Sequence, residues 1–225
     1  MPLQYQYSFF RIPKDGDVAS SVDKYKNLRL QALSIAPGSF SSTYEIESAL
    51  PNTEWKARLT ADQKETFACS ATPLHNDDPR SAIWVAQLTL RGPLTKEQFS
   101  LPAETDQRIP EDDRMEERWQ MLSLFTLPDH RGQRLGQKLC QEALSYLKSY
   151  RTTPSKVRVR LMVKPENHVT VKLYQKLGFR EIGKCTLVEA LIANGDADLL
   201  PEDRSEEKYT RRSGLIMVSE ISRLE

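Results

Sequence analysis

A strand, a tight turn and a helix follow one another over residues 121–150, and this stretch constrains the fold more than any other. Apolar side chains alternate up to Phe125, which predicts a strand. Pro128 ends that strand because proline has no N–H to give to the ladder. Apolar residues then recur at every fourth position, which predicts one face of a helix: Leu135, Leu139, Ala143 and Leu147.

The turn between this strand and this helix is basic and contains glycine. It consists of Arg131, Gly132, Gln133, Arg134, Leu135, Gly136 and Gln137. The first N–H groups of a helix have no partner inside the helix, and the helix dipole is positive at that end. With two arginines beside them, these groups predict a bound phosphate or pyrophosphate. An ordinary helix start with two solvated arginines explains the same residues, and the turn alone does not decide between the two.

A second helix is predicted to begin at Asn167, because apolar residues follow it at helical spacing. Gly178 ends this helix as a C-cap, and Phe179 leads into the next strand. Between the two helices, residues 156–164 alternate between two sets of side chains and predict a strand. A strand, a helix and a second strand in this order form a βαβ unit, so we expect the two strands to be parallel.

In this order and spacing, the two segments resemble the GCN5-related N-acetyltransferase (GNAT) superfamily. That family carries an R/Q-x-x-G-x-G/A turn after its fourth strand and, further along, an Asn followed by Leu-Tyr and then Gly-Phe. The corresponding residues here are Arg131 to Gly136, Asn167, Leu173, Tyr174, Gly178 and Phe179. The match is close over residues 119–189 and looser in the N-terminal part.

The resemblance implies an α+β fold with a central, mostly antiparallel, twisted mixed sheet, one splayed pair of parallel strands and flanking helices. Hydrophobic patterns elsewhere predict strands at residues 5–13, 65–71, 81–91, 179–192 and 213–221, and helices at residues 18–34 and 42–50. The run from Leu28 to Leu33, followed by Pro37, Phe40 and Tyr44, is similar to the first two helices of many GNAT proteins. Those helices usually border the acceptor site.

The length of 225 residues predicts a single domain over residues 1–225. An acidic insertion at residues 101–118 has too few apolar residues to bury much, which predicts that it is flexible. The formal net charge is +1, so no basic field indicates a nucleic-acid partner. No apolar run approaches the length of a membrane span.

The cysteines and histidines indicate neither disulfides nor a metal. Cys69, Cys140 and Cys185 are far apart and form no C-x-x-C motif, and Cys140 lies on the apolar side of its helix. The histidines share no ligand spacing. The N-terminus has no signal-peptide pattern. The sequence therefore predicts a cytoplasmic protein, a monomer or a homodimer, without a metal, nucleic acid or membrane partner.

The resemblance implies acetyl-CoA as cosubstrate. Residues Arg131 to Gln137 would hold its pyrophosphate through backbone N–H groups. The edge of the central strand at Phe125 and Thr126 would pair with the pantetheine arm. In the family this strand splays from the next parallel strand, and the thioester lies in the gap. A backbone N–H near Leu124 or Phe125 would polarise the thioester carbonyl.

The resemblance assigns catalysis to Tyr174, whose counterpart in the family lies close to the sulfur and protonates the leaving thiolate. A tyrosine packed on the helix face is the alternative. Asn167 would cap its helix and also bond the pantetheine arm, although capping alone explains it. No general base stands out, and the alternatives are a water chain or one of four residues: Glu45, Glu116, Glu117 and His130.

One residue departs from the family pattern. Arg134 stands where GNAT proteins have a glycine that lets the backbone approach the phosphates. We expect Arg134 to adopt helical backbone angles, with its side chain turned outward or folded over the phosphates. The departure supports a second hypothesis, a non-catalytic coenzyme A-binding or regulatory protein on the same fold. The presence of Tyr174 argues for the enzyme.

The acceptor is predicted to be a primary amine, on a small molecule or on a protein. Residues 194–208 contain six acidic and two basic residues. In the GNAT fold the loop between the last two strands borders the acceptor side. An acidic rim there predicts a positively charged amine, such as a polyamine, an aminoglycoside-like compound or a basic peptide. A solvated loop without a role in selection explains the same charges.

Overall fold

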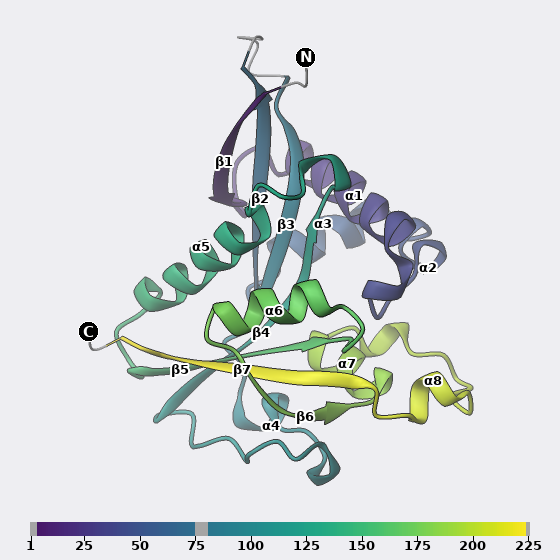
Figure 1. Cartoon of the computed structure of the whole chain (residues 1–225), viewed down its shortest axis with the longest axis vertical. Coiled ribbons are helices and arrows are strands. Elements are labelled where there is room, and N and C mark those ends of the chain that lie inside the picture. The colour runs from purple at the N-terminus through teal and green to yellow at the C-terminus, as the bar shows by residue number, and fades with distance from the viewer. Residues whose placement is uncertain (1–3, 75–80, 224–225) are drawn as a thin grey trace. The chain divides into compact units, whose positions relative to one another are not determined.

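Seven strands of the described residues form one mixed sheet in this computed structural model, which describes residues 4–74 and 81–223 (Figure 1). Their order is β1-β2-β3-β4-β5-β7-β6. The strands are β1 (Tyr5–Arg11), β2 (Lys64–Pro73), β3 (Ile83–Arg91), β4 (Glu116–Thr126), β5 (Lys156–Val163), β6 (Arg180–Cys185) and β7 (Gly214–Ser222). β1 and β2 are antiparallel, β7 is antiparallel to β5 and to β6, and β4 and β5 are parallel. The expected α+β fold with one parallel pair is confirmed.

The chain divides into two compact units. Unit 1 comprises Met1–Pro37, Thr43–Thr89 and Ser123–Leu144, and unit 2 comprises Gly38–Ser42, Leu90–Leu122 and Ser145–Glu225. β3, β4 and helix α5 (Leu135–Ser149) contribute residues to both units. The single domain over residues 1–225 stays a prediction.

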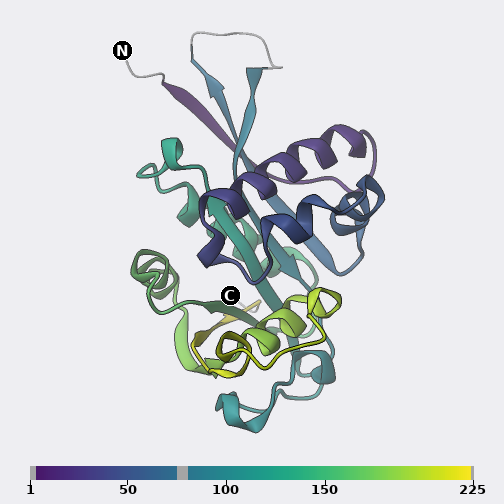
Figure 2. The ribbon, with the colours of Figure 1, turned by 90° about the vertical axis from the view of Figure 1, so that its right-hand side faces the viewer.

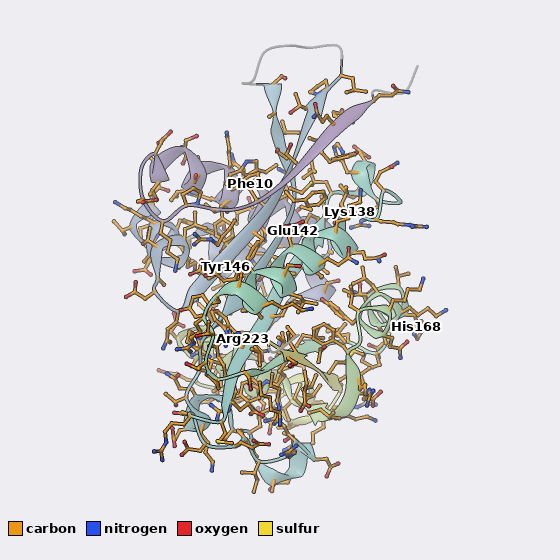
Figure 3. The ribbon with its side chains drawn as sticks, turned by 90° about the vertical axis from the view of Figure 1, so that its left-hand side faces the viewer. Phe10, Lys138, Glu142, Tyr146, His168 and Arg223 are labelled. Carbon is orange, nitrogen blue, oxygen red and sulfur yellow. The ribbon has the colours of Figure 1, made fainter. Side chains whose placement is uncertain are left out.

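Three helices of unit 1 pack together: α1 (Val18–Ile35), α2 (Tyr44–Ser48) and α3 (Asn52–Thr60). Figure 2 shows them in front of β2 and β3, and Figure 3, from the opposite side, shows α5 in front. Asp17 begins α1 by accepting a hydrogen bond from the Ser20 N–H at 3.2 Å. The rings of Tyr25 and Trp55 meet edge to face, with centres 5.8 Å apart. Around them lies an apolar core that includes Ile12, Val18, Val22, Leu59 and Ala68.

The end of unit 2 differs from its predicted structure. The strand predicted at residues 179–192 is wrong beyond residue 185, because helix α7 (Leu187–Asn194) follows β6. Thr186 accepts a hydrogen bond from the Glu189 N–H at 3.1 Å, and Glu189 accepts one from the Thr186 N–H at 2.9 Å. This reciprocal capping box starts the helix, and Gly195 at φ +81° ends it. The Thr-x-x-Glu spacing in the sequence indicates this helix start, whereas the apolar run around it favours a strand.

The remaining helices of unit 2 are α4 (Lys96–Phe99), α6 (His168–Lys176) and α8 (Glu207–Thr210). The helix expected after Asn167 is confirmed as α6. The helices predicted at residues 18–34 and 42–50 are confirmed as α1 and α2, the second being shorter than expected. α4 was missed because it has only four residues.

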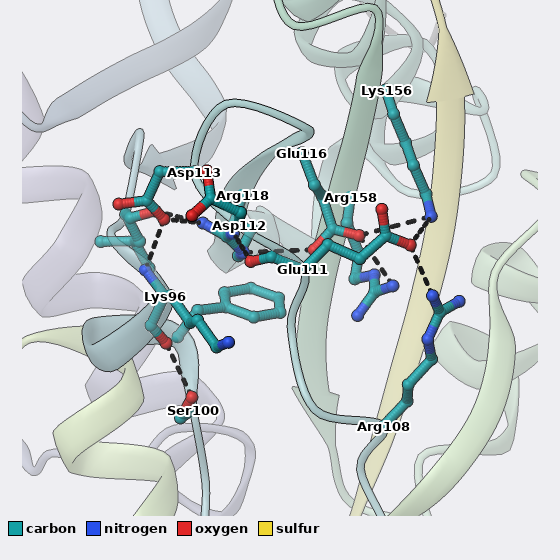
Figure 4. A network of polar contacts seen from close by, with 12 residues as sticks. Lys96, Ser100, Arg108, Glu111, Asp112, Asp113, Glu116, Arg118, Lys156 and Arg158 are labelled. Atoms are coloured by element: carbon teal, nitrogen blue, oxygen red, sulfur yellow. Dashed lines mark hydrogen bonds and ion pairs between the residues drawn. The ribbon is translucent and has the colours of Figure 1, made fainter.

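The acidic insertion is largely paired with bases (Figure 4). Glu111 forms an ion pair with Lys156 at 2.9 Å, and Asp113 forms one with Arg118 at 2.7 Å. Glu116 to Arg118 belong to β4, so the insertion is three residues shorter than expected. Glu116 itself is buried and pairs with Arg158 at 2.7 Å. Flexibility of the remaining insertion stays a prediction.

Candidate cofactor site and catalytic residues

β4 continues beyond its pairing with β5. The register with β5 ends at Met121 and Leu161, whereas β4 runs to Thr126. Just past the last pair, Ser123 has φ +60°, a left-handed conformation that is uncommon outside glycine. The first N–H after the strand, that of Leu127, bonds to the Val85 carbonyl of β3 at 2.8 Å.

That bond sets the direction of the backbone groups at the end of β4. N–H and C=O groups of successive residues in a strand point to opposite edges. Since Leu127 points to β3, Phe125 shares that edge, and Leu124 and Thr126 point to the opposite one. The side chain of Phe125 is buried, and those of Leu124 and Thr126 are partly exposed. The alternation therefore favours Leu124 and Thr126 over Phe125 for pairing with an added chain.

Arg131 folds back onto the end of β4. Its Nε donates a hydrogen bond to the Thr126 carbonyl at 3.1 Å, and its guanidinium lies 5.8 Å from the centre of the Phe125 ring. The short turn Pro128–His130 between them is closed by a bond from the Arg131 N–H to the Pro128 carbonyl at 3.1 Å. The turn is thus tied to the strand that precedes it.

The expected helical conformation of Arg134 is wrong, because its φ is +58°. Gly132 also has a positive φ, of +80°. The turn needs left-handed residues to bring the chain from η4 (Pro128–His130) into α5, and a glycine would meet this need without strain. A Cβ atom at position 132 would meet no other atom within 4 Å. Glycine is therefore favoured there by its positive φ and not by crowding.

Three N–H groups stand ahead of the hydrogen-bond ladder of α5. The Lys138 N–H bonds to the Arg134 carbonyl at 3.0 Å, which is the first bond of this helix. The N–H groups of Leu135, Gly136 and Gln137 therefore lie before the ladder, at the positive end of the helix dipole. Residues 131–134 are exposed, so an anion can reach these groups. The donors fit a pyrophosphate.

His130 is enclosed by two aromatic residues of β1. Its Nδ1 lies 3.1 Å from the Tyr7 hydroxyl, and its ring centre lies 4.8 Å from that of Tyr5. Burial lowers the pKa of His130, while Asp129 raises it by a smaller amount. His130 is therefore held neutral and joins β1 to the turn that carries the arginines.

Asn167 and Tyr174 lie on α6 in unit 2. Asn167 is the N-cap and accepts a hydrogen bond from the Thr170 N–H at 3.4 Å, which confirms the capping role. Tyr174 is buried, with its ring centre 5.7 Å from that of Phe179. Gly178 has φ +86°, and the Phe179 N–H bonds to the Tyr174 carbonyl at 3.0 Å, which closes the helix as predicted.

Two of the alternatives for a general base are engaged in ion pairs. Glu116 pairs with Arg158 at 2.7 Å and with Arg118 at 3.1 Å. Glu117 pairs with Arg223 at 2.6 Å and also accepts a hydrogen bond from Trp119 at 2.6 Å. Both carboxylates are buried and lie at ion-pair distance from arginines, so they are poorly placed to take a proton from an amine.

Glu45 differs from this pair because it is exposed. Hydrogen bonds from its own backbone N–H and from Thr43 lower its pKa. Together with His130 and a water chain, Glu45 remains an alternative for the base.

The cysteines of the described residues are free and buried. Burial raises the pKa of Cys140 to about 12 and that of Cys69 to about 11, so neither thiol is activated. No group of three or more potential ligands within residues 4–74 and 81–223 is arranged to hold a metal ion. His75 lies outside this described part of the chain. None of the helices placed by the structure is long and apolar enough to cross a membrane.

Residues 103–179 match the model of the acetyltransferase (GNAT) family. The matched range includes the turn from Arg131 to Gln137 and the motif from Asn167 to Phe179, which are the two segments that suggested the resemblance. A comparison with curated protein sequences gave no match.

Solved structures similar to this chain include several acetyltransferases. Arabidopsis thaliana NAA60 in complex with acetyl-CoA is 15% identical, with a TM-score of 0.59 over 96% of this chain and 99% of that chain. Spermidine N-acetyltransferase from Vibrio cholerae, in complex with CoA and spermine, is 13% identical, with a TM-score of 0.51 over 97% and 96% of the two chains. Ribosomal-protein-S18-alanine N-acetyltransferase from Escherichia coli is 11% identical, with a TM-score of 0.52 over 96% and 95% of the two chains. At these identities the similarity shows the GNAT fold.

Proposed function

We propose that this chain, which has the GNAT fold, is an acetyl-CoA-dependent N-acetyltransferase that transfers an acetyl group to a primary amine. The observation that carries the proposal is the start of α5. The N–H groups of Leu135, Gly136 and Gln137 precede the first bond of the helix, and the exposed Arg131 and Arg134 add positive charge. The family match over residues 103–179 includes this turn.

In the proposed complex the pyrophosphate of the cosubstrate accepts hydrogen bonds from these three N–H groups. Gly132 and Gln133 line the exposed side of the same turn. The pantetheine arm pairs with the backbone of Leu124 and Thr126, as a peptide adds to a sheet edge. Two further residues complete the proposed cofactor site. Phe125 contributes its buried side chain, and the amide group of Asn167, which also caps α6, bonds the pantetheine arm.

Bound acetyl-CoA supplies an activated acetyl group, whose carbonyl carbon accepts the amine nitrogen as the bond to sulfur breaks. The Leu124 N–H donates to the carbonyl oxygen, which gains negative charge during attack. Tyr174 donates its hydroxyl proton to the departing thiolate. The proton lost by the amine passes to Glu45, to His130 or to a chain of waters.

The acceptor is a small-molecule or protein amine. Spermidine N-acetyltransferase and ribosomal-protein-S18-alanine N-acetyltransferase, which share the fold, are named for one acceptor of each kind. The free cysteines of the described residues suit a reducing cytoplasm. Oligomeric state, monomer or homodimer, remains a prediction to be measured by light scattering.

A second candidate function is coenzyme A binding without turnover. Two observations favour it: Arg134 replaces the glycine of the motif, and Tyr174 is buried against Phe179. Both hypotheses require binding and differ in catalysis.

The test combines calorimetry with coenzyme A and acetyl-CoA with an acetyl-transfer assay on a panel of amines. We expect binding, and turnover with at least one amine. In Gly136→Glu a side chain and a negative charge would meet the pyrophosphate, so binding should be lost while the fold is retained. Gln141→Glu, which adds the same charge on an exposed position of α5, is the matched control. Unchanged affinity in Gly136→Glu would refute the site, and binding without turnover across the panel would support the second candidate.

A further inference from the structure

Ser123 occupies a strained position directly before the residue to which the proposed function assigns the thioester carbonyl. Its φ of +60° is unfavourable for a residue with a Cβ. The φ and ψ of Ser123 set the direction of the next N–H, that of Leu124. Such a conformation persists only where the surrounding structure holds it.

A side chain from α1 reaches this residue. Arg29 Nη1 donates a hydrogen bond to the Ser123 hydroxyl oxygen at 3.3 Å, across 94 positions of sequence. Arg29 is buried, with 4% of its surface exposed. All of these residues belong to unit 1.

The rest of the Arg29 guanidinium is held by Glu47 of α2. Nε donates to one carboxylate oxygen at 3.0 Å, and Nη2 donates to the other at 2.6 Å. This bidentate pair fixes the plane of the guanidinium and so the direction of Nη1. Arg58 of α3 approaches the same carboxylate at 3.3 Å. One charge network therefore joins three helices to the strained residue of β4.

Stability alone does not explain this network. Glu47 is fully buried, and a buried ion pair contributes little net stability because both charges lose their water. A planar, bidentate pair does provide a fixed direction, which a hydrophobic contact would not.

We infer that Arg29, held by Glu47, is a positioning residue that keeps Ser123 in its left-handed conformation and so aims the Leu124 N–H at the thioester carbonyl oxygen. This inference rests on the proposed function. α1 and α2 resemble the helices that usually border the acceptor site in GNAT proteins. Arg29 therefore links these helices to the N–H group that polarises the thioester carbonyl.

The test uses Ser123→Ala, which removes the accepting hydroxyl, and Arg29→Lys, which keeps the charge but loses the fork. We expect kcat to fall by about a hundredfold in each, the loss that a displaced carbonyl donor causes elsewhere. The affinity for acetyl-CoA should stay close to that of the wild type, because the pyrophosphate turn is unchanged. The double variant should lose no more than the larger single loss, since both changes break one interaction.

A second readout does not depend on turnover. The carbon-13 resonance of a labelled acetyl carbonyl in bound acetyl-CoA reports its polarisation, and we expect it to move toward the free value in both variants. Arg11→Gln is the control, because it removes an arginine from the ion pair with buried Glu65 at 2.7 Å, elsewhere in unit 1. This control should keep the wild-type resonance and kcat.

A folded Ser123→Ala protein with the wild-type carbonyl resonance would overturn the inference, even if the wild type turns over no amine. A loss of acetyl-CoA affinity with kcat and resonance unchanged would also overturn it, since the network would then serve binding. Failure of the wild type to bind acetyl-CoA would instead refute the proposed function, and this inference with it.

Discussion

Arg134 carries backbone strain that a glycine would relieve. A left-handed conformation costs a residue with a Cβ roughly 1–2 kcal/mol, and glycine gives back roughly 0.5–1 kcal/mol through its more mobile unfolded chain. We therefore expect Arg134→Gly to raise the free energy of unfolding by up to about 1 kcal/mol. Gly132→Ala, at φ +80°, should lower it by a similar amount. Urea denaturation of the two variants measures both signs, and a loss of stability in Arg134→Gly would show that its side chain makes a contact worth more than the strain.

Tyr174 is assigned as general acid, with simple packing as the alternative. Tyr174→Phe keeps the ring against Phe179 and removes the hydroxyl. If Tyr174 is the general acid, this variant should lose about 10²–10⁴-fold in kcat, with its affinity for acetyl-CoA nearly unchanged. Tyr146→Phe, on α5, is the control for loss of a hydroxyl. Turnover at the wild-type rate in Tyr174→Phe would leave packing as the role of this residue.

His130 links stability to pH. Its pKa in the folded protein lies below the unfolded value of 6.5, because burial disfavours the charged ring. As pH falls through 6.5, the unfolded chain binds a proton that the folded protein does not, so stability present above that pH is lost. Between about pH 7.5 and about pH 5, the wild type should lose more stability than His130→Gln. His168→Gln, which removes an imidazole at an exposed position, is the matched control. Parallel profiles for His130→Gln and the wild type would contradict this assignment.

At the scale of elements, the start of α7 depends on the capping box formed by Thr186 and Glu189. Thr186→Ala removes the acceptor for the Glu189 N–H and should cost about 1 kcal/mol. Thr186→Ser keeps a hydroxyl in the same place and should cost much less. The free energies of unfolding in urea separate the two. Equal losses would mean that the methyl group of the threonine, and not the cap, stabilises the start of this helix.

At the scale of the whole molecule, the acidic loop at residues 194–208 is less uniform than its composition suggests. Asp196 is buried and interacts with Arg91, so neutralising it would disturb the fold. Glu206 pairs with Lys208 at 3.0 Å and Glu207 pairs with Arg211 at 3.4 Å on the surface. Asp198, Glu202 and Asp203 are exposed and are the acids left to act on an approaching ligand.

We therefore predict that Asp198→Asn, Glu202→Gln and Asp203→Asn, combined in one variant, raise KM for cationic amines and leave it unchanged for neutral amines. The effect should shrink as salt rises, because exposed charges are screened beyond about 10 Å at 0.1 M salt. The measurement is kcat/KM for both kinds of amine at low and high salt. A common response of both kinds, or none, would show that the loop does not select charge. A variant with three exposed acids outside the loop neutralised to their amides, at Asp23, Glu54 and Glu97, controls for the altered net charge.

The sequence by itself determined the central strand, the turn and α5, the parallel strand that follows, and α6. These elements rest on short-range signals: apolar periodicity, a proline stop, an asparagine cap and a glycine C-cap, each acting within a few residues. The family motif lies in the same stretch, so the candidate pyrophosphate site was also predicted. The strand predicted beyond residue 185 is wrong. The apolar periodicity of this run favours a strand, whereas the capping box in front of it starts a helix.

Only the tertiary structure decided where charges are buried. The alternation of Arg158 and Arg160 with valines suggests a solvated strand face, yet both arginines are buried. Arg160 lies 4.0 Å from the centre of the Phe99 ring and donates to Gln120 at 2.7 Å. The contacts of Arg29 with Ser123 and of Tyr7 with His130 likewise join residues 94 and 123 positions apart. A charge or a strained residue is stable only beside the groups that compensate it, and those groups come from distant parts of the chain that a local pattern does not contain.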